Sequence, residues 1–267
     1  MSSKLMPYEI TGSEEGVPIV LVPGGLSGWI SWKPHAEVLS KTHKVIRVQL
    51  LNMAAAEKQQ VPSGGYSLRS ESEALENTLT MLKTEEVDLV GWSHGGEVSL
   101  DFALNYPERV RTLTLIEPAV YWVARAFRKF EEEERELKNL FAGFHDPPSE
   151  DDLIGFLRMN GLVSPGADPR SMPRWPVWNS LKTALLSLST VVSHTDDLDR
   201  LKALLGKPVL LVKGKESVGA NSGIVDLLSK AIGSSSKVII LPDGHACHIV
   251  AQDHFIVELE QFILSSL

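Results

Sequence analysis

Short apolar runs alternate along the chain with longer segments whose apolar residues recur at helical spacing. An uninterrupted run such as residues 17–22 is typical of a strand that is buried on both faces of a parallel sheet. Residues 68–83 instead carry Leu75, Leu79 and Leu82 on one helical face. The alternation predicts parallel βαβ units, and hence an α/β fold with a doubly wound, mostly parallel sheet. The predicted strands, beginning with an edge strand, are residues 5–11, 17–22, 43–50, 87–90, 110–116, 208–214 and 237–242.

The alternation of strands and helices stops after residue 117 and resumes near residue 199. The interval holds a loop over residues 161–176 that is rich in proline and glycine, and three segments with helical patterns, residues 125–141, 150–159 and 177–192. It has no strand pattern. We therefore predict a helical cap, residues 118–198, inserted into one core domain that is formed by residues 1–117 and 199–267.

The strand pattern at 87–90 leads directly into Gly91-x-Ser93-x-Gly95, and a helical segment follows. A serine at the tip of so tight a turn is held in a strained backbone conformation that exposes its hydroxyl, and the flanking positions have almost no room for side chains. A strand before the serine and a helix after it are the context expected of a nucleophile elbow. The alternative is a glycine-rich turn that binds nothing.

Composition and charge narrow the classes of function. The 267 residues carry a formal net charge of -8 and no basic cluster, so nucleic acid is not an expected partner. The single cysteine, Cys247, excludes an internal disulfide and fits a reducing compartment. The start of the chain is unlike a signal peptide, and no apolar stretch is long enough to span a bilayer. We predict a cytoplasmic protein with no membrane partner, metal or cofactor; a homodimer is left open.

A serine hydroxyl needs a general base, and that base needs an orienting carboxylate. After an elbow serine, the acid and then the histidine are expected to follow along the chain. His245 fits the base, because it follows the last predicted strand and a glycine. His248 is the nearest competitor, and His254 falls inside the final predicted helix.

Two carboxylates compete for the orienting acid. The usual place, three residues past the glycine that ends the strand after the cap, is occupied by Ser217, and Glu216 is one residue short of it. Glu117 directly follows the buried strand after the elbow helix, where an unpaired charge would be unfavourable. We favour Glu117 and keep Glu216 as the alternative. The loop after the second strand, residues 23–26, is a candidate oxyanion loop, with the N–H of Gly25 directed at a substrate carbonyl.

The elbow, the loop at 22–25, the Tyr-Pro-Glu-Arg-Val link at 106–110 and the Gly244-His245 loop together resemble the α/β-hydrolase superfamily over nearly the whole chain. The resemblance implies that Ser93 is the nucleophile, that His245 is the base, and that the N–H groups of Gly25 and His94 form an oxyanion hole. It implies hydrolysis of a small-molecule ester or lactone through an acyl-enzyme. The chain departs from the pattern at residues 23–24, Pro-Gly for His-Gly, and at residues 49–52, which replace an acidic loop.

A glutamate at position 117 is similar to haloalkane dehalogenases and to zearalenone-type lactonases. Ser93 speaks against the dehalogenases, which use an aspartate nucleophile. The lactonase resemblance extends to the loop at 22–26 and to Pro-Val-Trp at 176–178. Tryptophans that line an apolar pocket beneath the cap would in turn predict a bulky apolar or aromatic substrate. The predicted contacts are Leu26, Trp122 and Trp178, with Trp29 and Trp175 as further candidates. The alternative is a non-hydrolytic protein on the same fold, either a carbon–carbon bond enzyme or a ligand receptor.

Overall fold

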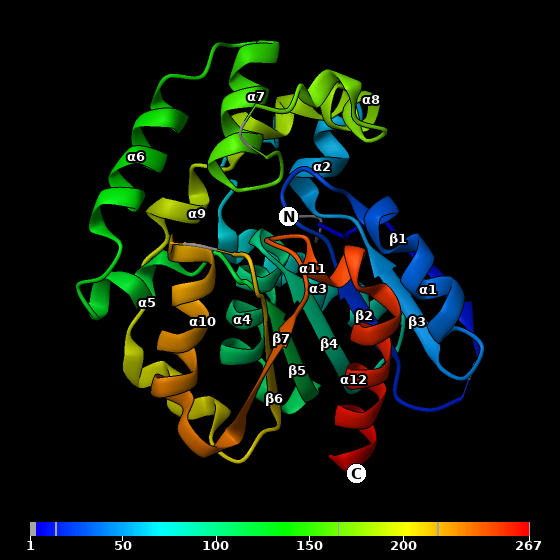
Figure 1. Cartoon of the computed structure of the whole chain (residues 1–267). Coiled ribbons are helices and arrows are strands. Elements are labelled where there is room, and N and C mark those ends of the chain that lie inside the picture. The colour runs from blue at the N-terminus through cyan, green and yellow to red at the C-terminus, as the bar shows by residue number, and fades with distance from the viewer. Residues whose placement is uncertain (1–3, 14, 165, 218, 267) are drawn as a thin grey trace.

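A seven-stranded sheet with the order β1-β3-β2-β4-β5-β6-β7 forms the centre of the computed structural model, which describes residues 4–13, 15–164, 166–217 and 219–266 (Figure 1). Strand β1 pairs antiparallel with β3, and each of the other pairs is parallel. The predicted mostly parallel α/β sheet is therefore confirmed. The strands are β1 (Tyr8–Gly12), β2 (Ile19–Val22), β3 (Lys44–Val48), β4 (Val87–Trp92), β5 (Val110–Ile116), β6 (Val209–Gly214) and β7 (Ser236–Leu241).

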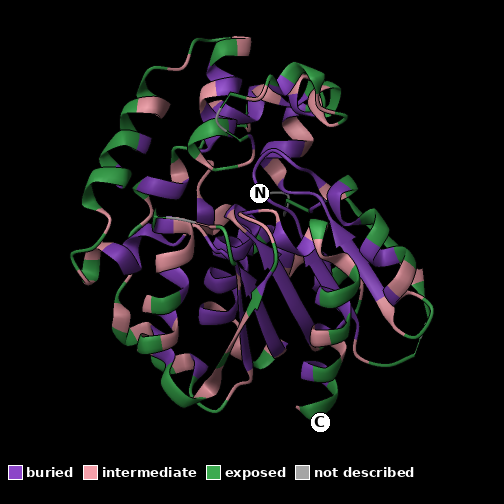
Figure 2. Ribbon diagram, in the orientation of Figure 1, coloured by how far each residue is buried: buried purple, intermediate pink, exposed green. Residues whose placement is uncertain are grey.

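Helices cover both faces of the sheet, which explains why its central strands are apolar throughout. Successive side chains of a strand point to opposite faces. In β2, Ile19 and Leu21 join a core cluster with α1 and α12, whereas Val20 and Val22 join the cluster with α3, α4 and α10. Figure 2 shows the buried strands between helices whose outer faces are exposed. The helices of this part of the chain are η1 (Trp29–Trp32), α1 (Lys33–Leu39), α2 (Leu51–Ala56), α3 (Leu68–Met81), α4 (His94–Asn105), η2 (Pro107–Arg109), α10 (Gly219–Ile232), η6 (Gly233–Ser235), α11 (Cys247–Val250) and α12 (Gln252–Ser265).

The described residues between β5 and β6 form helices and loops only. We call residues 118–198 the helical insertion. In Figure 1 its helices α6, α7 and α8 lie above the end of the sheet at which β4 and β5 finish. No helix among the described residues combines the length and the apolar character needed to cross a bilayer. The elements from β5 to β6 are α5 (Tyr121–Ala126), α6 (Glu131–Ala142), α7 (Glu150–Met159), η3 (Pro169–Ser171), α8 (Trp175–Ser180), η4 (Lys182–Ser187), α9 (Thr190–Ser193) and η5 (Leu198–Leu204).

Two helices predicted in the insertion are broken in the structure. The predicted helix 125–141 is interrupted because Arg128 and Phe130 have left-handed backbone conformations, with φ of 51° and 59°. The Phe130 ring lies against Gly223, where an added Cβ would approach it to 2.0 Å. The predicted helix 177–192 is three short helices, because serine and threonine hydroxyls along it donate to nearby backbone carbonyls and compete with regular helix formation.

The structure also contains a helix that the sequence did not predict, α2. The N–H groups of Leu51 and Asn52 at its start donate to the buried carboxylate of Glu71 in α3, at 2.8 and 3.1 Å. A carboxylate accepts such N–H groups favourably at a helix start. Since this acceptor lies about twenty residues away in the sequence, no local pattern indicates it.

Candidate active site

Ser93 lies at the junction of β4 and α4 and has the backbone conformation expected of an elbow, with φ 54° and ψ -119°. The flanking glycines have no room for a side chain. A Cβ on Gly91 would lie 2.3 Å from Ser99 Oγ, and a Cβ on Gly95 would lie 2.3 Å from the carbonyl oxygen of Pro23. The glycine spacing in the sequence therefore has a steric cause: the turn packs directly against helix α4 and the loop after β2.

His245 bridges the elbow serine and a carboxylate. Its Nε2 is 3.1 Å from Ser93 Oγ, and its Nδ1 is 2.7 Å from Glu117 Oε2. The imidazole is buried, with 4% of the residue exposed. The indole Nε1 of Trp92 donates to the His245 carbonyl at 2.9 Å, so the residue next to the serine also holds the backbone that carries the histidine. Sequence reasoning missed this contact, because a buried tryptophan in a strand is ordinary core.

Glu117 reaches the histidine from the end of β5. Its backbone has a positive φ of 40°, and its N–H donates to the Val212 carbonyl at 3.0 Å. Its Oε1 accepts the N–H of Gly214 at 2.7 Å. Burial disfavours the charged carboxylate, but the hydrogen bonds from His245 and from the Gly214 N–H outweigh it and keep the Glu117 pKa below its usual value. The alternative acid, Glu216, is exposed and is not the carboxylate on His245 Nδ1.

The two competing histidines lie elsewhere. His248 is buried between the rings of Trp32 and Trp92, with ring centroids 4.8 and 4.6 Å away. Burial lowers its pKa well below the usual value, so the ring is neutral. His254 is an exposed residue of α12. Among His245, His248 and His254, all of which the structure describes, only His245 contacts Ser93.

Gly25 and His94 flank the serine hydroxyl on another side. An added Cβ on Gly25 would lie 3.6 Å from His94 Cβ and 2.8 Å from Leu188 Cδ2, so the two predicted oxyanion residues are neighbours. Neither of their N–H groups donates a hydrogen bond to a residue in the described part of the chain. Burial lowers the pKa of the His94 imidazole to about 4. Its Nδ1 lies 3.5 Å from a Glu97 carboxylate oxygen and its Nε2 lies 3.4 Å from the Tyr66 hydroxyl, so both ring nitrogens face other side chains.

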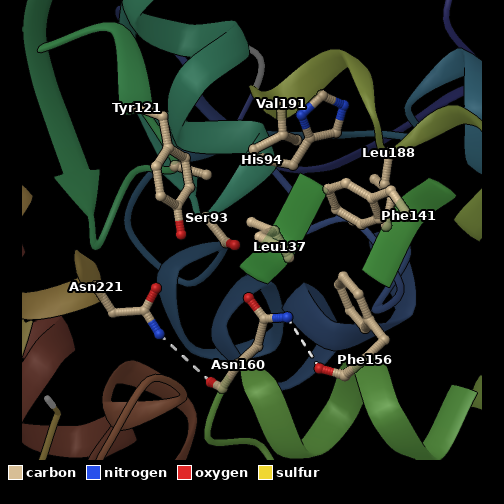
Figure 3. Close-up of a pocket in the computed structure, with 12 residues that line it drawn as sticks. Ser93, His94, Tyr121, Leu137, Phe141, Phe156, Asn160, Leu188, Val191 and Asn221 are labelled. Carbon is tan, nitrogen blue, oxygen red and sulfur yellow. Dashed lines mark hydrogen bonds between the residues drawn. The ribbon is translucent and has the colours of Figure 1, made fainter. Parts of the chain in front are cut away.

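Two hollows of different character lie next to the Ser93–His245 pair: Ser93 lines the first and His245 lines the second. The first, which we call the apolar cavity, has a volume of about 30 Å³. In Figure 3 the polar groups of Ser93, Asn160 and Asn221 lie on one side of it, and the rings of Phe141 and Phe156 lie on the other. Its lining is Gly25, Ser93, His94, Ala119, Tyr121, Leu137, Phe141, Phe156, Asn160, Leu188, Val191 and Asn221.

The second hollow, which we call the polar groove, has a volume of about 490 Å³ and opens beside His245. Asn160 and Asn221 line both hollows and so form the boundary between them. The Asn221 side chain donates to the Asn160 carbonyl at 3.4 Å. The groove is lined by Arg158, Met159, Asn160, Gly161, Val163, Ser164, Glu216, Ser217, Asn221, Asp243, Gly244 and His245.

Of the predicted substrate contacts, one lines a hollow beside the candidate active site and two do not. Leu26 lines a small recess together with Ser93 and His245. Trp122 and Trp178 do not line the recess, the apolar cavity or the polar groove; both pack into the hydrophobic core. Neighbouring residues of a helix point about 100° apart, so Tyr121, and not Trp122, faces the cavity from α5.

The further candidates Trp29 and Trp175 are partly exposed and do not line these hollows either. The aromatic rings at the apolar cavity are those of Tyr121, Phe141 and Phe156, all from the helical insertion. The aromatic candidates predicted from the sequence were tryptophans, a choice that did not consider on which helix face each aromatic residue lies.

One group of metal-ligand type occurs among the described residues, away from Ser93. It consists of Asp101, His194 and Asp196, whose ligand atoms lie within 4.8 Å of one another. Asp101 also pairs with Arg69 at 3.2 Å and Asp196 with Arg200 at 2.6 Å. Arginines already neutralise both carboxylates, so the group is a salt-bridge network and not a cation site.

Comparison of this sequence with models of known protein families agrees with the geometry of the elbow, the histidine loop and the sheet. A model of the alpha/beta hydrolase fold family matches residues 17–252. The chain belongs to the alpha/beta hydrolase fold family. Its curated relatives include hydrolases and esterases.

Two relatives illustrate the range of similarity. The 2-hydroxy-6-oxo-2,4-heptadienoate hydrolase of Pseudomonas putida is 36% identical over 105 residues, which cover 38% of this chain and 37% of that protein. The matched segment therefore spans less than two fifths of that relative's length. The pimeloyl-[acyl-carrier protein] methyl ester esterase of Nitrosomonas europaea is 25% identical over 256 residues, which cover 93% of this chain and 95% of that protein.

Solved structures show the same fold. A hydrolase from Pseudomonas aeruginosa PA01 superposes with a TM-score of 0.77 at 20% identity, over 97% of this chain and 94% of that one. An esterase from Exiguobacterium antarcticum superposes with a TM-score of 0.76 at 18% identity, over 97% and 95% of the two chains. At such identities the likeness establishes the fold and nothing finer.

Proposed function

We propose that this protein is a serine hydrolase that cleaves a carboxylic ester or lactone through an acyl-enzyme. The observation that carries the proposal is the position of His245, whose two ring nitrogens lie 3.1 Å from Ser93 Oγ and 2.7 Å from Glu117 Oε2. A nucleophile, a base and an orienting carboxylate in hydrogen-bond contact are the arrangement that makes a serine hydroxyl reactive. The curated esterase relative supports the same class of substrate.

The reaction follows from these positions. Ser93 Oγ attacks the carbonyl carbon as His245 Nε2 takes its proton, and Glu117 stabilises the resulting imidazolium. The N–H groups of Gly25 and His94 bind the oxyanion, and each such donor contributes roughly 3 kcal/mol to the barrier reduction. His245 then protonates the leaving alkoxide. In the second half, His245 takes a proton from water, which attacks the acyl group and releases the carboxylic acid and Ser93.

We also propose that the helical insertion, residues 118–198, acts as a cap over this site. The support is that the insertion provides most of the apolar side chains beside Ser93, from α5 to α9. Such a cover excludes water and provides an apolar surface for the substrate. The core domain would then be residues 1–117 and 199–267.

The test replaces the nucleophile. Ser93→Ala is expected to lower kcat/KM for p-nitrophenyl butyrate by roughly 10⁴-fold or more, with an unchanged circular dichroism spectrum. Ser193→Ala, at an exposed serine of α9, is the matched control and should keep full activity. Equal release of acid and alcohol is expected. Binding of an ester without turnover by the wild type would instead identify a receptor on the same fold, and wild-type rates in Ser93→Ala would remove the serine from the mechanism.

A further inference from the structure

We infer that the two hollows beside Ser93 divide the substrate between them. A short, unbranched apolar acyl group occupies the apolar cavity, and a polar alcohol that is neutral or cationic occupies the polar groove. The inference rests on the proposed function, since it assigns the two halves of an ester that Ser93 cleaves.

The direction of the ester follows from where the proton must go. The leaving oxygen takes its proton from His245 Nε2, so the alcohol must lie next to His245. His245 lines the polar groove and does not line the apolar cavity. Gly25 and His94, which would hold the carbonyl oxygen, line the apolar cavity and not the groove. Ser93, Gly25 and His94 all line the apolar cavity, whose remaining walls are mostly apolar, so we place the acyl substituent there.

The size and lining of the apolar cavity limit the acyl group. Its volume of about 30 Å³ compares with about 490 Å³ for the groove. Its apolar walls include Leu137, Phe141, Phe156, Leu188 and Val191 (Figure 3). Only a short acyl chain can enter such a space with little movement of its walls, whereas a branched or aromatic acyl group would displace these side chains, and overpacking is unfavourable.

The charges that line the polar groove favour an alcohol group that is neutral or cationic. Its lining contains one cationic side chain, Arg158, and two carboxylates, Glu216 and Asp243. The remaining polar groups there are uncharged donors and acceptors, among them Asn160 and Asn221. An anionic alcohol would meet an excess of negative charge, whereas hydroxyl-bearing or cationic alcohols would find acceptors.

The first experiment varies the acyl group with one leaving group, using p-nitrophenyl acetate, butyrate, octanoate and pivalate. Wild-type kcat/KM is expected to fall by roughly 10-fold or more from butyrate to octanoate and to pivalate, as for a group that exceeds its pocket. Phe141→Ala should raise the octanoate-to-acetate ratio by roughly 10-fold. Phe144→Ala is the matched control, because that ring packs on Phe141 with centroids 5.7 Å apart but does not line the cavity.

The second experiment varies the alcohol with one acyl group, using the acetate esters of glycerol, choline and glycolate. The glycerol and choline esters should exceed the glycolate ester in kcat/KM by roughly 5-fold, as expected for partly exposed charges. Glu216→Lys should shift the choline-to-glycolate ratio toward glycolate by roughly 10-fold. Glu108→Lys makes the same charge change at an exposed residue beyond the start of β5, at the opposite end of that strand from Glu117, and should shift the ratio less than twofold.

The outcomes separate the two proposals. If Ser93→Ala is inactive but acyl preference changes with Met159→Ala, a substitution in the groove, and not with Phe141→Ala, the proposed function stands and the division of the substrate is wrong. A glycolate ester preferred by the wild type would also overturn the inference. If the wild type hydrolyses none of these esters, or if Ser93→Ala retains wild-type rates, both proposals fail.

Discussion

Replacement of Glu117 by glutamine is expected to lower kcat/KM by roughly 10³- to 10⁴-fold while leaving the fold intact. The substitution changes neither size nor shape, and the side chain it alters is buried and held at both oxygens. The Gly214 N–H donates to Oε1 at 2.7 Å, and His245 Nδ1 lies 2.7 Å from Oε2.

These two contacts decide how the amide will sit. The Gly214 N–H needs an acceptor, so the amide oxygen takes the position of Oε1 and the NH₂ group takes that of Oε2, facing His245 Nδ1. An NH₂ group can pair only with an unprotonated Nδ1, so the ring proton moves to Nε2. Nε2 is the nitrogen that must accept the Ser93 proton. A 10⁴-fold loss corresponds to about 5.5 kcal/mol of barrier, which combines this wrong tautomer with the missing counter-charge for the imidazolium.

The assay is hydrolysis of p-nitrophenyl butyrate between pH 6 and 9, with Glu216→Gln as the matched control. Because hydrogen bonds keep the Glu117 pKa below its usual value, this carboxylate stays charged across that range and should add no pH dependence of its own in the wild type. Glu216→Gln should retain activity within threefold. A Glu117→Gln rate within tenfold of wild type, or a larger loss in Glu216→Gln, would refute the reasoning.

Three further predictions use contacts around the site and in the core. Trp92→Phe removes the donor to the His245 carbonyl and should lower the free energy of unfolding by about 1–3 kcal/mol and kcat by roughly 10-fold. The control is Trp32→Phe, which should affect kcat little because the Trp32 Nε1 has no partner among the described residues. Equal losses of kcat in the two variants would contradict this prediction. Gly95→Ala drives a Cβ into a backbone oxygen at 2.3 Å, while Gly64→Ala meets nothing within 4 Å, so only the first should abolish activity in esterase assays. Burial raises the pKa of Glu71 to about 7, and a raised carboxyl pKa makes the folded state less stable as pH rises. Between pH 5 and 8, the free energy of unfolding of the wild type, measured by urea denaturation, should therefore fall by roughly 2–3 kcal/mol relative to that of Glu71→Gln. The same pH dependence of the unfolding free energy in both proteins would oppose the prediction.

The parts of the fold that the sequence predicts are those with local causes. Strand β2 is apolar at each of its four positions because helices cover both faces of the sheet, and its length separates it from a helix. The elbow is predictable because its motif is local: the serine and both glycines lie within five consecutive residues, although Gly95 is required by a contact with the distant Pro23 carbonyl. His245 is likewise locally placed, since it lies in the loop that follows the last strand, which ends at Leu241.

The parts that the sequence did not predict depend on contacts between distant segments. The start of α2 is fixed by Glu71, and the break before α6 by Phe130 packing against Gly223. The apolar cavity is lined from several short helices of the insertion, whose mutual orientation no periodicity reveals. For this reason the predicted contacts Trp122 and Trp178 lie outside the lining of the cavity, and the pocket phenylalanines were overlooked.

The central claim is that one hydroxyl, that of Ser93, is made reactive by His245. The most direct measurement is covalent labelling with an alkyl fluorophosphonate, followed by intact mass and peptide mapping. The account predicts one adduct per chain, located at Ser93, and a labelling rate that falls by orders of magnitude in His245→Ala. Labelling at another residue, or an equal rate with and without the imidazole, would contradict it.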